Sequence, residues 1–241
     1  MLVKTKAIVI STLKYQEKSL IVKCFTQSHG LKTYFVRDAF SSRKSSRSLN
    51  TKIGYFQPLT ILEIEAIHKN KGTLENFKEI KIATPFQTLH SDVFKSTIVL
   101  FLSEILHHSI HEEEKNELLF TFLETALHWL DNHTETANFH LILMLEITKY
   151  LGFYPDISSI EFSFFDTKEG VFKPFQELGS LTEHETNLFK KLILLKFDTD
   201  QKTFHVIERQ ILLNLLVDYY TFHLEGFRKP KSLEVLKEVF S

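Results

Sequence analysis

Residues 1–83 contain short runs of β-branched and aromatic residues separated by polar turns, a pattern typical of β-strands. The runs that fit a strand are residues 4–12, 19–26, 30–37, 58–67 and 74–82. Strands of this length with regular turn signals indicate an all-β sandwich or barrel, and five of them fit a small closed barrel. The OB-fold is the five-stranded barrel of this kind that binds oligonucleotides.

A long polar connector, residues 38–55, joins the third and fourth predicted strands. Its serines alternate with four basic residues, Arg43, Lys44, Arg47 and Lys52. Connectors of this length inside a compact domain are usually either functional or disordered. We therefore include the basic residues of this connector in the candidate binding surface.

Near Pro85 the spacing of apolar residues changes to three and four, which indicates amphipathic helices. The predicted helices are residues 94–106, 118–130, 139–151, 188–195 and 206–224. Residues 139–151 are apolar on most faces, which predicts a buried central helix. Residues 153–176 alternate around a turn at 167–170 and predict an inserted β-hairpin.

Together these patterns predict an α+β multidomain protein. An N-terminal five-stranded OB-fold-like β-barrel, residues 1–82, would bind nucleic acid. A mainly α-helical domain, residues 83–241, would follow, with the β-hairpin inserted at residues 153–177.

The distribution of charge changes this picture more than the overall composition does. Residues 1–83 contain fifteen Lys/Arg and six Asp/Glu, whereas the rest of the chain contains fourteen and twenty-four. The net charge of −1 is thus an average over a basic N-terminal part and an acidic C-terminal part. Such asymmetry points to nucleic acid or an acidic surface as the partner of the basic part.

The candidate DNA-binding residues lie within residues 1–52, which contain eleven Lys/Arg and two acidic residues. Basic side chains hold phosphates without sequence-specific contacts, and aromatic rings provide surfaces on which bases stack. Tyr34 and Phe35 fall on opposite faces of the third strand, so one ring points into the barrel, and alternation does not say which. The predicted site is Lys32, Tyr34, Arg37, Arg43, Lys44, Arg47 and Lys52, with Tyr34 as the stacking ring. The competing interpretation is that these lysines only solubilise a small barrel.

Signals for catalysis are weak. His107, His108, His111 and Glu112 could be read as a metal cluster and a hydrolase site, but the dipole of a helix C-terminus favours histidines without any metal. Gly-rich phosphate loops and the GxSxG elbow are absent from the sequence. Cys24, the single cysteine, lies in an apolar strand and is expected to be a buried, inert thiol. We expect no catalytic residue, no metal and no cofactor.

A membrane partner is not expected, because no apolar run approaches the roughly 18 residues of a membrane helix. A single cysteine also suits a reducing cytosol, so a cytoplasmic protein is expected.

The order of these parts resembles the bacterial RecO family of DNA repair proteins. Residues 6–46, KAIVISTLKYQEKSLIVKCFTQSHGLKTYFVRDAFSSRKSS, are similar to the opening of that family, and residues 57–65, QPLTILEIE, to its fourth strand. Residues 117–130, ELLFTFLETALHWL, and 145–157, LEITKYLGFYPDI, resemble its helical domain, where a helix ending in Gly–Phe leads to a proline. The resemblance covers most of the chain.

One departure from the family concerns the hairpin. Many members carry four cysteines there, which form a structural zinc site, whereas residues 153–176 contain none. The five phenylalanines of the segment are expected to supply apolar packing instead, at roughly 1.5–3 kcal/mol for each buried ring. They are Phe162, Phe164, Phe165, Phe172 and Phe175.

The resemblance implies a non-enzymatic recombination mediator that binds single- and double-stranded DNA and anneals complementary strands. It implies that RecR is a partner in helping RecA displace single-strand-binding protein, that the acidic C-terminal tail of that protein is contacted, and that the protein is nucleoid-associated. The basic patches that could take such a tail are Lys190, Lys191 and Lys196, or Arg228, Lys229 and Lys231. The alternative is a helical protein-interaction module with an incidental basic barrel.

Overall fold

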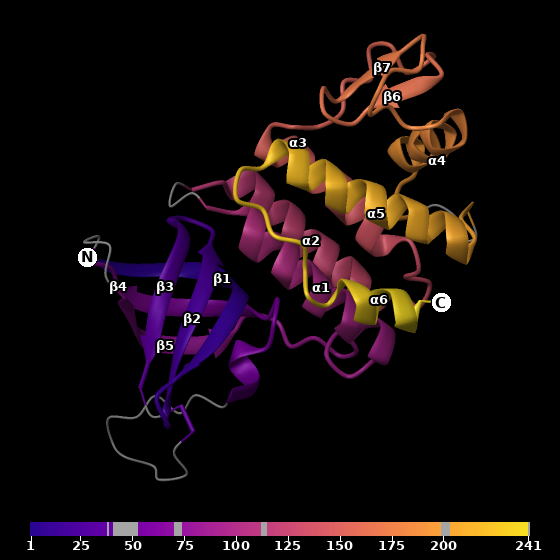
Figure 1. Ribbon diagram of the computed structural model, residues 1–241. Coiled ribbons are helices and arrows are strands. Elements are labelled where there is room, and N and C mark those ends of the chain that lie inside the picture. The colour runs from indigo at the N-terminus through magenta and orange to yellow at the C-terminus, as the bar shows by residue number, and fades with distance from the viewer. Residues whose placement is uncertain (38, 41–52, 70–73, 112–114, 199–202, 241) are drawn as a thin grey trace. The chain divides into compact units, whose positions relative to one another are not determined.

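The computed structural model, shown in Figure 1, describes residues 1–37, 39–40, 53–69, 74–111, 115–198 and 203–240. Contacts between Cα atoms divide the chain into two compact units, Met1–Asn132 and His133–Ser241. The first unit contains a barrel and two helices, and the second contains the remaining helices and a two-stranded sheet. The division into domains at residues 82 and 83 that the sequence suggests stays a prediction.

Five strands close the barrel in the order β1-β2-β3-β5-β4, with β4 pairing back onto β1. The strands are β1 (Leu2–Tyr15), β2 (Ser19–Thr26), β3 (Gly30–Val36), β4 (Ile61–Ile67) and β5 (Glu75–Ile82). β3 and β5 pair in parallel, and every other neighbouring pair is antiparallel. This arrangement confirms the five-stranded OB-type barrel predicted from the sequence.

Two strand boundaries differ from the sequence prediction by three residues. β1 continues to Tyr15, and the turn begins only at Gln16, whose φ is 55°. β4 begins at Ile61 rather than at residue 58, because a 3₁₀-helix, η1 (Ile53–Phe56), and a turn come first. Leu59 in that turn has φ 58° and donates its backbone N–H to the carbonyl of Val9.

The inner face of the barrel forms a packed apolar core. Its buried side chains come from all five strands and from η1, and include Val9, Val22, Cys24, Tyr34, Val36, Phe56, Leu62, Ala66, Phe77 and Ile80. The ring of Tyr34 stacks on Phe77 with centroids 4.1 Å apart. Cys24 is fully buried, which confirms the prediction of a buried core cysteine, and burial raises the pKa of its thiol.

Two helices, α1 (Val93–Ser109) and α2 (Glu117–Asn132), belong to the same unit as the barrel and lie against its outer face. Phe25 on β2 contacts Phe120 on α2, with ring centroids 6.0 Å apart. Ser11 on β1 lies 3.1 Å from Nδ1 of His107 on α1. These contacts cover one end of the outer face of β1 and β2.

The second unit is built on α3 (Phe139–Leu151), the helix that the sequence predicts to be central and buried. Nine of its thirteen side chains are buried, and Gly152 ends it with φ 83° in the left-handed region that favours glycine. The other helices are α4 (Glu183–Leu194), α5 (Val206–His223) and α6 (Leu233–Val239). The sequence analysis missed α6, because seven residues are too few to show a clear helical period.

The inserted hairpin is confirmed as β6 (Phe164–Asp166) paired with β7 (Val171–Lys173). Phe165 and Phe172 are buried against each other, and Phe165 also contacts Phe189 of α4, with ring centroids 4.8 Å apart. The expectation that Phe175 adds to this packing is wrong, since its side chain is 77% exposed. Phe162 and Phe164 are half-buried.

An ion cluster holds the same hairpin. The Lys173 ammonium lies 3.0 Å from the Asp166 carboxylate, 2.9 Å from Glu169 and 2.7 Å from Glu177. These carboxylates raise the pKa of Lys173, Glu177 contributing most. Ion pairs as well as apolar packing therefore stabilise this hairpin, which has no cysteine.

Candidate nucleic-acid interface

An apolar row crosses the outer face of β1, β2 and β3 at the end that α1 and α2 leave uncovered. Leu13 pairs with Ile21, and Ile21 pairs with Phe35, so the three side chains share one face. Tyr15 meets Phe35 edge to face, with centroids 6.0 Å apart. Leu13 is 63% and Tyr15 44% exposed, so this row is open to solvent.

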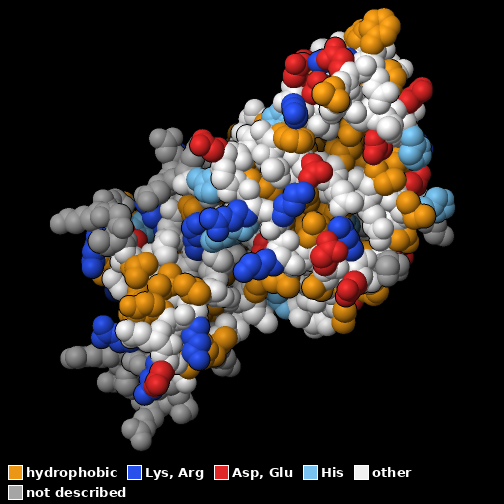
Figure 2. All heavy atoms as spheres, viewed as in Figure 1, with side chains coloured by type: hydrophobic (Ala, Val, Ile, Leu, Met, Phe, Trp, Pro, Cys, Tyr) orange, Lys and Arg blue, Asp and Glu red, His pale blue; other side chains and the backbone are white. Residues whose placement is uncertain are grey.

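Cationic side chains border this row. Lys14, Lys18 and Arg37 are exposed, and Lys23 is half-buried, where burial lowers the pKa of its ammonium. The Lys14 ammonium also lies 5.5 Å from the ring centroid of Phe40, itself 41% exposed. Figure 2 shows a hydrophobic patch bordered by Lys and Arg over strands β1–β3. Such a combination offers rings for bases and charges for phosphates.

Acidic side chains are sparse in this region. Among the residues that the structure describes, Lys14, Lys18, Lys23 and Arg37 form no ion pair within 4.0 Å. In the described part of β1–β3 and their turns, the acidic residue is Glu17, and it is exposed. Within the described part of the chain, these cations are therefore available to a phosphate backbone without the displacement of an acidic partner.

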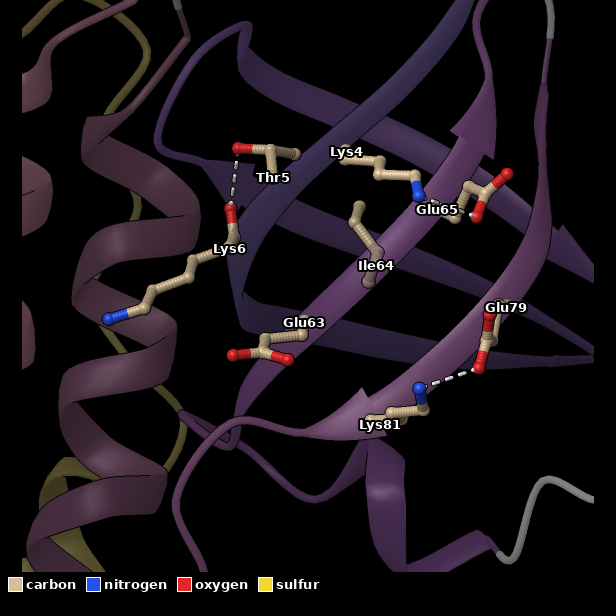
Figure 3. A pocket seen from close by; sticks show the side chains of 8 residues that line it. All are labelled: Lys4, Thr5, Lys6, Glu63, Ile64, Glu65, Glu79 and Lys81. Carbon is tan, nitrogen blue, oxygen red and sulfur yellow. Dashed lines mark hydrogen bonds and ion pairs between the residues drawn. The ribbon is translucent and has the colours of Figure 1, made fainter.

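The barrel face formed by β1, β4 and β5 differs in charge (Figure 3). Lys4 and Lys78 pair with Glu65 at 3.6 and 2.6 Å, and Lys81 pairs with Glu79 at 2.8 Å. All of these side chains except Lys78 line a depression of about 360 Å³. The acids neutralise the basic residues of this face.

One further barrel lysine is neutralised by a helix. The Lys6 ammonium lies 2.7 Å from the Glu124 carboxylate of α2 and points away from the depression in Figure 3. Lys4, Lys6, Lys78 and Lys81 therefore contribute less to a phosphate site than a count of basic residues suggests.

The predicted site residues fall into three groups. Arg37 is exposed beside the apolar row, and Lys32 is half-buried on the face of β3 that also carries Tyr34. Arg43, Lys44, Arg47 and Lys52 lie outside the described residues.

The prediction of Tyr34 as the stacking ring is wrong. Its side chain is 0% exposed, and its hydroxyl lies 2.8 Å from Nε2 of the buried His68. Phe35 is the ring that faces outward on this strand. Sequence alternation places the two rings on opposite faces of the strand but does not say which ring points inward, because that depends on how the barrel closes.

Sequence reasoning also missed Leu13 and Ile21. Both are apolar residues at cross-strand positions that the barrel core does not need. The sequence feature that could have indicated this row is the apolar pair Leu13 and Tyr15 at alternate positions near the end of the first strand, where outward positions are normally polar.

The histidine cluster of α1 shows no metal-binding arrangement. His107 contacts Ser11 and the ring of His108, and burial lowers the pKa of His107. His111 is exposed, and Glu112 lies outside the described residues. Within the described ranges, no group of three or more His, Cys, Asp or Glu side chains could hold a metal ion. No described helix has the length and apolar character needed to cross a membrane.

The fold places the chain among proteins that join an OB-type barrel to a helical region containing a small two-stranded sheet. Residues 1–86 match the family model "Recombination protein O N terminal", and residues 90–234 match "Recombination protein O C terminal". The chain belongs to the RecO family of DNA repair proteins.

Curated relatives agree along the whole chain. It is 75% identical to the DNA repair protein RecO of Flavobacterium psychrophilum and 71% identical to that of Flavobacterium johnsoniae. The identity to the DNA repair protein RecO of Christiangramia forsetii is 42%. Each alignment covers 100% of both sequences.

Proposed function

We propose that this protein is a non-enzymatic DNA-binding mediator of recombination and repair. It binds single- and double-stranded DNA through its barrel and anneals complementary strands. With RecR it helps to load RecA onto DNA coated by single-strand-binding protein, whose acidic C-terminal tail it contacts. It works in the cytoplasm, in association with the nucleoid.

The observation that carries the DNA-binding part is the basic and aromatic face of β1–β3, whose exposed cations form no ion pair with another described residue. Tyr15, Phe35 and Phe40 are accessible there, and Lys14, Lys18 and Arg37 surround them within the described chain. Stacking of a base on such a ring contributes roughly 1–3 kcal/mol, and it tolerates any sequence because every base has a π-face.

The annealing part follows from electrostatics. Two complementary strands repel each other, and a basic surface that neutralises phosphates lowers this repulsion. No bond is made or broken in this process, so the proposal needs no catalytic residue.

The proposed partner contacts belong to the second unit. An acidic tail needs a local basic patch, and Lys190, Lys191 and Lys196 or Arg228, Lys229 and Lys231 are the candidates. Lys229 is paired with Asp218 at 2.7 Å, and the Lys190 ammonium lies 5.5 Å from the ring centroid of Phe172. Lys191, Arg228 and Lys231 are exposed.

A salt titration of affinity for an unstructured single-stranded oligonucleotide tests the DNA-binding part. Replacing Lys14, Lys18 and Arg37 together with Ala should flatten the slope of log K against log salt by up to about two units, because each lost phosphate contact removes about 0.7. The triple variant of Arg43, Lys44 and Arg47 should do the same if the connector contributes.

The matched control removes three charges from the neutralised face. The variant Lys4→Ala, Lys78→Ala, Lys81→Ala loses lysines that already pair with Glu65 and Glu79, so its slope should stay near that of the unmodified protein. Equal slopes for all of these proteins would remove the β1–β3 face and the connector from the site. That result would favour the helical protein-interaction module, in which the exposed Phe175 and Leu178 are available for docking.

A further inference from the structure

A pocket of about 240 Å³ opens in the first unit, and its lining contains no residue of β1, β2 or β3. It is formed where η1, the turn before β4, the end of β5 and the segment before α1 come together. The lining residues are Gly54, Gln57, Thr60, Ile82, Thr84, Pro85, Phe86, Gln87, His90 and Ser91.

The chemistry of the lining is polar without formal charge. Two amides, three hydroxyls and an imidazole offer both donors and acceptors, and Phe86, Pro85 and Ile82 supply apolar surface. Burial lowers the pKa of His90, with Asp131 opposing this effect. A phosphate or carboxylate would find no Lys or Arg among the described residues that line the pocket. A flat, uncharged heterocycle would find partners for its edges and an apolar surface for its face.

The wall of the pocket is held in place by a network beneath it. The Asp131 carboxylate accepts the backbone N–H groups of Gln87, Thr88 and Leu89 at 2.8 to 3.1 Å. The buried Lys95 ammonium donates to the Asp131 carbonyl at 2.8 Å and to the Thr88 hydroxyl at 2.7 Å. These bonds fix the turn that presents Gln87, so the pocket exists before any ligand arrives.

The Phe86 ring is also constrained. It contacts His128 with centroids 5.4 Å apart and His90 with centroids 6.0 Å apart. The imidazole of His90 in turn lies 3.2 Å from the Thr60 hydroxyl through Nε2. A ring held on two sides loses little freedom when a ligand packs on its remaining surface.

The sequence places this pocket next to the basic connector. Gly54, one of the lining residues, comes two residues after Lys52, the last basic residue of the connector. The connector and this pocket are therefore neighbours in the sequence.

We propose that this pocket binds a nucleobase turned out of a DNA strand, with its face against Phe86 and its edges on the side-chain amides of Gln57 and Gln87. The proposal rests on the proposed DNA-binding function for the source of the base. A base held here is unstacked from its neighbours, so the site is complementary to single-stranded rather than duplex DNA.

The first test uses nucleosides and does not depend on DNA binding. Thymidine or adenosine, added to the full chain, should shift the ring NMR signals of Phe86 and His90 in a saturable manner, and inorganic phosphate should not. Gly54→Phe should abolish the shifts by filling the pocket, because a side chain at Gly54 meets open space and its φ is not positive. Gln87→Leu, which removes one amide, should weaken them, and the matched variant Gln176→Leu on an exposed site of the second unit should not.

The second test uses a single-stranded thymidine oligonucleotide. Gly54→Phe should lower its affinity by about fivefold or more, with the slope of log K against log salt unchanged, because a base contact releases no counterion. Absence of nucleoside shifts, shifts that survive Gly54→Phe, or a flattened salt slope would each overturn the proposal. Nucleoside shifts in a protein that binds no oligonucleotide would instead support the pocket and refute the proposed DNA-binding function.

Discussion

Tyr34 and Phe35 are neighbours in β3 whose rings lie on opposite faces of the strand, one inside the barrel and one outside. The Tyr34 ring stacks on Phe77 inside the barrel, and its hydroxyl satisfies a nitrogen of buried His68. Burial raises the pKa of the Tyr34 phenol, so it stays protonated across the physiological range. Phe35 lies outside, against Tyr15, where it contributes little to the core.

This difference predicts opposite outcomes for two small substitutions. Tyr34→Phe should lower the free energy of unfolding by about 1–3 kcal/mol, because it leaves a buried His68 nitrogen without its partner, and should leave oligonucleotide affinity unchanged. Phe35→Ala should weaken the affinity by roughly 1–3 kcal/mol through the loss of a stacking ring. Urea unfolding and oligonucleotide titration of both variants measure the two quantities. A loss of affinity in Tyr34→Phe that exceeds the loss in Phe35→Ala would contradict the assignment of the outer ring.

The β6–β7 hairpin shows how an element can be held without a metal. Phe165 and Phe172 fill its buried side, and the Lys173 ammonium joins carboxylates from β6, the turn and the segment after β7. The Asp166 carboxylate also accepts the backbone N–H groups of Lys168 and Glu169. Burial alone would raise the pKa of Asp166, but these hydrogen bonds and Lys173 lower it overall.

Lys173→Met should therefore loosen this hairpin selectively. The variant removes the cation from three carboxylates, so backbone amides of β6 and β7 should exchange with deuterium faster, while those of the barrel keep their protection. The matched control is Lys168→Met, at an exposed residue of the same turn whose ammonium lies 5.8 Å from the ring centroid of Phe222 rather than at the three carboxylates. Unchanged exchange in Lys173→Met would show that the aromatic packing alone holds the hairpin.

The Asp166 carboxylate of this cluster makes the stability of the hairpin depend on pH in the acidic range. A carboxyl whose folded pKa is depressed contributes stability above its unfolded pKa, about 3.9 for Asp, and this contribution is lost as pH falls through the folded value. The hairpin of the unmodified protein should thus begin to loosen below about pH 4.

At the level of the whole molecule, the first compact unit extends beyond the barrel to Asn132. Ile8, Phe25 and Leu31 lie on the outer face of their strands, yet each is less than 9% exposed. Phe25 packs on Phe120 of α2, and Lys6 pairs with Glu124 of the same helix. The barrel therefore uses α1 and α2 as a cover for apolar surface that it cannot bury alone.

This dependence predicts which fragments are stable. A fragment of residues 1–132 should unfold cooperatively on heating, because its core and its cover are both present. A fragment of residues 1–82 exposes Ile8, Phe25 and Leu31, whose burial stabilises by roughly 1.5–3 kcal/mol each, and should melt at a lower temperature or aggregate. Calorimetry of the two fragments makes the comparison. Equal melting temperatures would show that α1 and α2 are not part of the folding unit of the barrel.

Much of the fold is readable from periodicity. Residues 19–26 and 139–151 have the same bounds in the sequence prediction as in β2 and α3, because each run is long, strongly patterned and bounded by clear turn or cap residues. The pocket at Phe86, Gln87 and His90 could not be predicted from the sequence, because its segments come together only through tertiary contacts such as those of Asp131 and Thr60.

The sequence by itself determined the strands, the main helices, the hairpin and the excess of basic residues in the N-terminal part, since these depend on local period and composition. Only the tertiary structure decided that Tyr34 points inward and Phe35 outward, and which lysines are neutralised. The physical reason is that alternation fixes which side chains share a face, whereas barrel closure, cross-strand register and the cover of α1 and α2 decide which face is buried.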